Sequence, residues 1–245
     1  MRRIVFAMLP LLIAGLASAQ TTDTTASAAP RVTLPKQGRT GNDFIMLQLG
    51  HTIWDGKPDS INTKGWSRSF NAYIMLDFPF RTNTHFSVAL GPGISAESMF
   101  FDKMTVGIKE NTSTLNFTDV SDTNYFKKYK LVTAFLELPI ELRYSADPDN
   151  PNRGFKFAVG AKIGTMVNAH VKGKELRNRS GNTISDYILK ENSKRFFNKN
   201  RLSVMARIGY GRFSAFGTYS ITPLFREGLG PEVRPITIGL ALSGL

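Results

Sequence analysis

Apolar side chains recur at every second position over most of the chain, beginning near Asp43. In residues 132–144, valine, leucine, isoleucine and tyrosine alternate with positions that include threonine, glutamate and arginine. A period of two is typical of a β-strand, whose successive side chains point to opposite faces of a sheet. The pattern predicts eight strands, over residues 43–54, 70–78, 86–97, 132–144, 155–168, 202–210, 213–221 and 236–242. No segment has a convincing helical period, so the sequence predicts an all-β fold.

The less apolar face of these strands is rich in glycine, alanine and serine, with single charges spaced along it. In a water-soluble sandwich or lipocalin, that face would meet water and would carry many charges. Small residues instead fit the crowded interior of a narrow eight-stranded barrel. We therefore expect the bulky face to point to lipid and the charges to pair in the lumen. The predicted lumen charge network is Asp77, Glu97, Glu137, Glu141, Arg143, Lys156, Lys162 and Arg207.

The connections between the predicted strands alternate in length. Short turns fall at residues 81–84, 146–153 and 211–212, and long loops at 55–65, 101–128, 171–200 and 222–234. Short turns and long loops alternate in this way in outer-membrane barrels. The sequence thus predicts an eight-stranded antiparallel up-and-down transmembrane β-barrel over residues 42–245.

Aromatic residues gather near the predicted strand ends, as the girdles at the two lipid–water boundaries of a barrel do. The expected girdle at the long-loop end consists of Trp54, Trp66, Phe100, Phe101, Phe126 and Tyr129.

The first segment of the chain has the pattern of an export signal. Two arginines precede a short apolar run, and Ala17-Ser18-Ala19 forms a small-residue cleavage site. This pattern predicts a signal peptide over residues 1–19, cleaved after Ala19. Residues 20–41, rich in threonine, serine, alanine and proline, are expected to form a flexible periplasmic leader.

Composition narrows the class further. The chain has 245 residues, no cysteine and 42% hydrophobic residues. A chain without cysteine is no disulfide-stapled miniprotein or thiol enzyme, and the apolar fraction is too high for a disordered chain. The mean hydropathy of −0.15 argues against a bundle of membrane helices, whereas it is compatible with strands that alternate polar and apolar residues.

Three segments resemble a known family. They are FLELPIELRY (135–144), FKFAVG (155–160) and YSITPLF (219–225), the last followed by GLGP (228–231). They are similar to the small outer-membrane β-barrel proteins of Bacteroidota, often called PorT-like. The resemblance implies an eight-stranded barrel in the outer membrane of a Gram-negative bacterium, with no enzyme activity or cofactor. The member that gives the group its name belongs to a protein-secretion apparatus.

The sequence offers little for catalysis or metal binding. His51, His85 and His170 have none of the spacings of a metal hydrolase, so no metal or cofactor is expected. Glu137 and Glu141 stand four positions apart on one strand face, about 13 Å, too far to share a proton. An outer-membrane lipid-modifying enzyme using His170 remains a minor alternative, because nothing near it identifies a nucleophile.

The basic excess, a formal charge of +12, concentrates between residues 172 and 201. The predicted basic outer loop contains Lys172, Lys174, Arg177, Arg179, Lys190, Lys194, Arg195 and Lys199. On an external loop these cations would meet the phosphates of lipopolysaccharide or an acidic partner, or would simply be solvated. Nucleic acid is rejected as a partner, because an exported barrel rarely meets it.

The sequence therefore favours a plugged outer-membrane barrel with a structural or interaction role and no catalytic residue. Its expected partners are outer-membrane lipid and lipopolysaccharide, and envelope or secretion-machinery proteins. The main alternative is a secreted soluble barrel, lipocalin-like, that binds an apolar ligand.

Overall fold

The computed structural model describes residues 45–150 and 153–244. The predicted signal peptide and leader lie outside the described residues. Within them every regular element is a strand, which confirms the all-β prediction. The strands are β1 (Ile45–Asp55), β2 (Arg68–Ile74), β3 (Leu76–Pro79), β4 (Phe86–Leu90), β5 (Gly93–Phe101), β6 (Met104–Val106), β7 (Phe117–Asp119), β8 (Tyr125–Ser145), β9 (Phe155–Arg177), β10 (Thr183–Asn192), β11 (Asn200–Tyr210), β12 (Phe213–Ser220) and β13 (Arg234–Ser243). In the part of the chain so described, we find no helix with the length and apolar character needed to cross a membrane.

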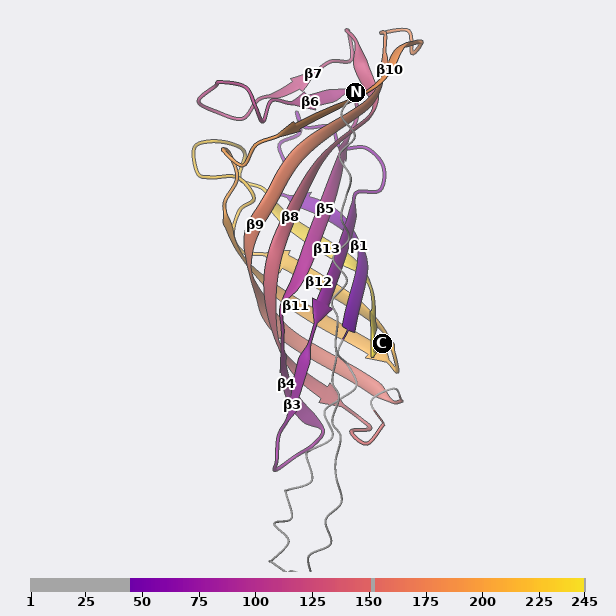
Figure 1. Ribbon diagram of the computed structural model, residues 1–245, viewed down its shortest axis with the longest axis vertical. Helices are drawn as coiled ribbons and strands as arrows, with labels where there is room; N and C mark the ends of the chain where they lie inside the picture. Colours follow the sequence, from indigo (N-terminus) through magenta and orange to yellow (C-terminus); the bar gives the residue numbers. More distant parts are fainter. Residues whose placement is uncertain (1–44, 151–152, 245) are drawn as a thin grey trace, which may run out of the picture. The chain divides into compact units, whose positions relative to one another are not determined.

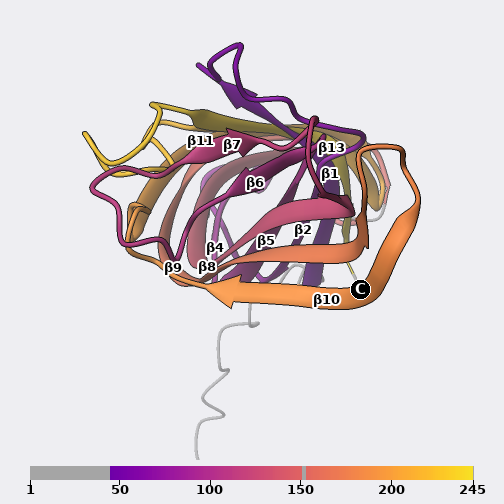
Figure 2. The ribbon, with the colours of Figure 1, turned by 90° about the horizontal axis from the view of Figure 1, so that it is seen from above.

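Antiparallel pairing connects the main strands in one continuous order. The order runs β9-β11-β12-β13-β1-β2-β5-β8, and β8 pairs in turn with β9, so the ladder returns to its first strand. Seen from above, the strands surround a common axis (Figure 2). The described ends of the chain lie together, since Met46 of β1 is opposite Ser243 of β13. We call this end of the sheet the short-turn end, because the turn between β11 and β12 is there.

β3 and β4 continue β2 and β5 beyond a local break. Pro92 lies between β4 and β5 and interrupts their hydrogen bonding, because it has no N–H to donate. Its carbonyl still accepts a hydrogen bond of 2.9 Å from the Ile74 N–H. A Cβ atom on Gly91 would lie 1.8 Å from the Ile74 carbonyl oxygen. Glycine is therefore required where the two backbones cross, and the β3–β4 hairpin extends below the rest of the sheet (Figure 1).

Burial along the strands is the reverse of that in a water-soluble barrel. On β8, Glu137, Glu141 and Arg143 are buried, whereas Leu136 and Ile140 are 49% and 43% exposed. The other long strands repeat the pattern, with serine, lysine or arginine inside and isoleucine, valine or phenylalanine outside. The inward face is thus small and polar, and the outward face is an apolar band.

β8 and β9 are the longest strands, with 21 and 23 residues, and reach far above the apolar band (Figure 1). β10 pairs with the upper part of β9, and β6 pairs with β7. The sequence predicted residues 101–128 and 171–200 as loops, which is wrong where these strands lie. The alternation of polar and apolar residues is hard to recognise in these strand segments, because lysines replace apolar residues on the outward face.

A second core fills the long-loop end. Trp54 contacts Phe101 and Phe225 with ring centroids 5.7 and 5.8 Å apart, and Phe197 contacts Phe225 at 5.2 Å. We call this cluster of buried residues the cap. The predicted long-loop girdle is therefore wrong for four of its members: Trp54, Phe101, Phe126 and Tyr129 are all at most 9% exposed and belong to the cap. These side chains lie on the inward face, which is apolar above the lumen charges.

Candidate functional site: the charged lumen and its cap

Glu137 is the centre of one buried cluster in the lumen. Its Oε2 accepts hydrogen bonds from the Tyr73 hydroxyl at 2.6 Å and from Lys162 Nζ at 3.2 Å. Its Oε1 accepts a hydrogen bond from Arg201. Four strands, β2, β8, β9 and β11, thus meet at a single carboxylate.

Arg201 extends this cluster across the lumen. It pairs with Glu97 of β5 at 2.6 Å and donates to Ser95 Oγ at 3.3 Å. Its guanidinium also lies 3.9 Å from the centroid of the Phe135 ring. Cations stack on aromatic faces in this way, which helps to compensate for the loss of water around a buried charge.

A second cluster surrounds Glu141, nearer the short-turn end. Its Oε2 accepts hydrogen bonds from Arg143 Nε at 2.7 Å and Arg207 Nη2 at 2.9 Å. Arg143 also lies 3.7 Å from Asp77, which accepts a hydrogen bond of 2.7 Å from Ser87. This cluster ties β8 to β11 and to the β3–β4 hairpin.

The contacts above include seven of the eight predicted lumen charges. The eighth, Lys156, is buried on the inward face of β9. Sequence reasoning missed Arg201 and Tyr73, which belong to the Glu137 cluster. Arg201 has the same parity on β11 as Arg207, and this was the signal that could have identified it.

The chemistry of the clusters is that of buried ion pairs. Each carboxylate is held by at least two cations, and none of the hydrogen bonds described for Glu137 or Glu141 joins it to another acid. Among the described residues, no group of three or more histidines and acids could hold a metal ion. Removing one charge would leave its partners buried and uncompensated, which is strongly unfavourable.

A small hollow lies between the Glu137 cluster and the cap. Its volume is about 10 Å³, and it is lined by residues that include Thr52, Glu97 and Leu224. A single water molecule needs about that much space.

The three histidines have different hydrogen-bond partners. His51 Nδ1 contacts the Ser67 carbonyl at 2.8 Å, and His85 Nδ1 contacts the Ser145 carbonyl at 2.8 Å. His170 contacts Asn168 at 3.3 Å. None of these hydrogen bonds joins a histidine to a serine side chain or an acid.

The predicted basic outer loop is split among several elements. Lys172, Lys174 and Arg177 lie on β9, Lys190 lies on β10, and Arg179 lies in the turn between them. The remaining members, Lys194, Arg195 and Lys199, lie in the connection to β11. The prediction of one continuous loop is therefore wrong, because half of the segment is paired strand.

A sheet that buries charges and exposes an apolar band defines the class of membrane β-barrel proteins. Comparison with known proteins agrees. A model of the family described as "Outer membrane protein beta-barrel domain" matches residues 37–226. The chain belongs to this family, and its location is the outer membrane.

A solved structure of a mutant Rh. blastica porin shares 8% identity with the chain, covering 83% of this chain and 98% of the porin, with a TM-score of 0.14. A TM-score this low carries no argument about the fold. No curated protein matches the chain.

Proposed function

We propose that the chain is a closed, eight-stranded transmembrane barrel with a plugged lumen and a structural or interaction role. The observation that carries this proposal is the inverted burial, with paired charges inside and an apolar band outside. Counting β2 with β3 and β4 with β5 as single lines, the ring of pairings has eight members. An eight-stranded barrel is just wide enough for side chains to fill its interior.

Two layers support a plugged lumen rather than a pore. The Glu137 and Glu141 clusters bridge strands across the lumen. Above them the cap adds an apolar layer that includes Trp54, Phe197 and Phe225. A diffusing solute would have to break several buried ion pairs and displace the cap.

The orientation in the membrane follows from the connections. Outer-membrane barrels have short periplasmic turns and longer external loops, so the cap and the β9–β10 arm would face outward. A rigid, folded external end suits contact with another envelope component. The resemblance to PorT-like barrels of Bacteroidota supports a link to protein secretion or envelope assembly.

Neither alternative gains support from the site. A lipocalin-like protein would need an apolar cavity, but the lumen is lined by charges. An enzyme would need a nucleophile beside a base, and the hydrogen bonds of His170 include none.

Fractionation of cells and electrophoresis of the mature chain, with and without boiling, would test the proposal. We expect the chain in the outer-membrane fraction, migrating faster before boiling because the folded barrel is compact. A periplasmic, water-soluble chain with no shift on heating would overturn the proposal and favour the lipocalin-like alternative.

A further inference from the structure

Cations cover the outer wall directly above the apolar band. In the strand register, Lys130 of β8 is opposite Lys172 of β9, which is opposite Lys190 of β10. One row higher, Lys128 is opposite Lys174. Like charges placed directly opposite on neighbouring strands repel each other, so this arrangement lowers the stability of the free protein.

Nearby lysines show that the sheet can neutralise a cation where acids are available. Lys64 pairs with Asp102 at 2.9 Å, and Lys127 pairs with Glu175 at 2.8 Å. Among the residues that the structure describes, no acid lies within ion-pair distance of Arg68 or of the five lysines in the two rows.

A β-bulge points two of these lysines outward. Ala134 is opposite Asn168 and Phe135 is opposite Met166, so Val167 is an extra residue on β9. Below the bulge, odd-numbered β9 residues face outward; above it, Ala169 and Val171 are buried. Without the extra residue, Lys172 and Lys174 would point into the cap. Bulges commonly redirect side chains in this way.

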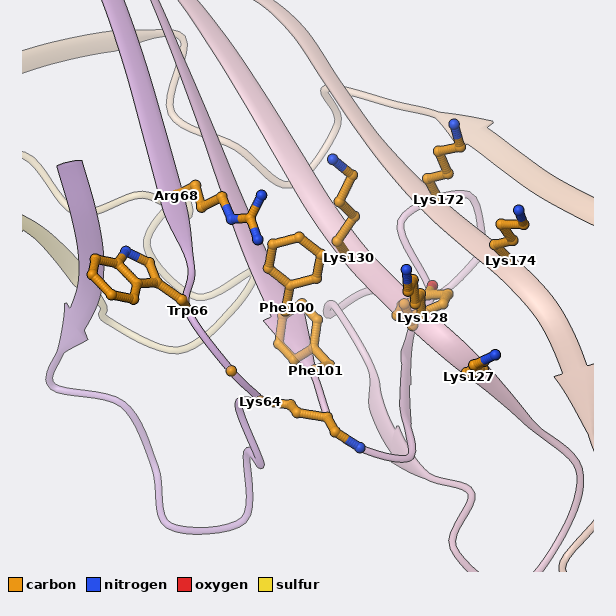
Figure 3. A pocket seen from close by; sticks show the side chains of 12 residues that line it. Lys64, Trp66, Arg68, Phe100, Phe101, Lys127, Lys128, Lys130, Lys172 and Lys174 are labelled. Atoms are coloured by element: carbon orange, nitrogen blue, oxygen red, sulfur yellow. The ribbon is translucent and has the colours of Figure 1, made fainter. Parts of the chain in front are cut away.

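The lysines line a shallow hollow of about 500 Å³ on the outer wall. Figure 3 shows Arg68, Phe100 and Lys130 beside one another, with Lys172 and Lys174 on the next strand. Lys130 Nζ lies 5.5 Å from the centroid of the Phe100 ring. Trp66, 68% exposed, lies at the other side of the hollow, and an exposed tryptophan of this kind is typical of the lipid–water boundary.

An apolar groove of about 900 Å³ continues from this hollow down the outer wall. Trp66 and Arg68 line both spaces, so the two are contiguous. Below them the groove is lined by side chains that include Leu49, Phe70 and Leu240. The wall therefore has a cationic upper part and a long apolar lower part.

We infer that this wall binds a phosphorylated, acylated glycolipid of the outer leaflet, the class to which lipopolysaccharide belongs. The phosphates would lie on Lys130, Lys172 and Lys174 with Arg68, and one acyl chain would lie in the groove beneath. Such a ligand matches both parts of the wall, since it carries anionic groups directly above hydrocarbon. The inference rests on the proposed transmembrane function and places the phosphate site on paired strands rather than on the connection that holds Lys194 and Lys199.

Binding of fluorescent lipopolysaccharide to the full chain in detergent micelles tests the inference. The variant Lys130→Gln/Lys172→Gln/Lys174→Gln removes three wall cations. The control Lys109→Gln/Lys194→Gln/Lys199→Gln removes three exposed cations from the same end of the molecule, and none of the three forms an ion pair with another described residue. We expect the wall variant to bind roughly a hundredfold more weakly, since each lysine near an anionic surface contributes about fivefold, and the control to bind like the unaltered chain.

Equal binding by the wall variant, or an equal loss in the control, would overturn the inference. So would equally tight binding of dephosphorylated lipopolysaccharide, because the phosphates would then not be recognised. The heat shift on gels is read for every variant. If it is retained while phosphate-dependent binding is absent, the glycolipid site is wrong and the barrel stands; if the unaltered chain has no shift, the barrel itself is wrong. Should the triple variant not fold, the single Lys172→Gln variant is compared with Lys194→Gln.

Discussion

Individual side chains decide whether the lumen is stable, and Glu137 is the most connected of them. Its carboxylate is 2% exposed and compensates Lys162 and Arg201 at once. A carboxylate at the solvent-facing end, Glu175, also holds two cations, Lys127 and Arg177. The two acids have similar partners but different surroundings, so they should respond differently to neutralisation.

Replacing Glu137 with glutamine should destabilise the folded barrel by about 3 kcal/mol, because two buried cations would lose their shared counter-ion. The urea concentration at which the fast-migrating gel band disappears measures this effect. Glu175→Gln is the control and should lower that midpoint less than Glu137→Gln does, because water at the solvent-facing end screens its ion pairs. Equal effects of the two variants would contradict the reading of the lumen as a network of compensated charges.

Glu175 also offers a test of pH dependence. Hydrogen bonds from Lys127 and then Arg177 lower the pKa of its carboxyl to about 2, from an ordinary value near 4.5. Because the folded pKa is the lower one, the stabilising effect of this acid is full above pH 4.5 and is lost as the pH falls through about 2. Carboxyl resonances followed by NMR should show Glu175 titrating near pH 2, and Lys127→Gln should raise that pKa. An unchanged value in the variant would assign the shift to other neighbours.

At the scale of elements, the side chains of β8 face three different environments along the strand. Its outward side chains are apolar from Leu136 to Tyr144 and cationic at Lys128 and Lys130. Its inward side chains change from charges to the aromatic residues of the cap. Ile140 lies in the middle of the apolar row, opposite Ala161 of β9.

An arginine at position 140 should therefore hinder insertion. Ile140→Arg places a charge near the middle of the apolar band, where it costs about 2–4 kcal/mol. Val132→Arg points outward on the same strand but lies beside the lysines, where the cost is about 0–1 kcal/mol. Folding into vesicles, followed by the heat shift, compares the two. If both variants folded equally well, the apolar band would not be facing hydrocarbon.

At the scale of the whole molecule, the proposed plug consists of two layers, the charge clusters and the cap. The charge clusters consist of charged side chains and the cap of apolar ones, and the two layers touch where the Arg201 guanidinium lies 3.9 Å from the ring of Phe135, a cap residue. Closure should therefore survive the loss of either layer alone.

Planar-bilayer recordings test this independence. We expect no steady conductance from the unaltered chain, and none from Trp54→Ala, because the Glu137 and Glu141 clusters still fill the lumen after the cap is weakened. The heat shift confirms that the variant is folded. Steady current from Trp54→Ala would mean that the cap alone closes the barrel, and steady current from the unaltered chain would contradict a plugged lumen.

Prediction from the sequence worked where the alternation was uninterrupted. Glu137, Glu141, Lys162 and Arg207 could be assigned to the inward face because parity along a strand specifies the face. Arg201 was missed because it stands at the end of a segment that reads as a basic loop, one residue before the predicted strand. The cap was missed because its members come from five or more separated segments. A local sequence pattern does not show that such segments come together in the fold.

The chain's period of two and its small inward residues were sufficient to predict an all-β protein with an apolar outer face, because both are properties of single strands. Partner choice among the charges depends on the register between strands, which alternation leaves open. The same holds for the wall lysines: continued parity would point Lys172 and Lys174 inward, and one extra residue at Val167 reverses them. That reversal is set by pairing between β8 and β9, so it becomes visible only when the strands are brought together.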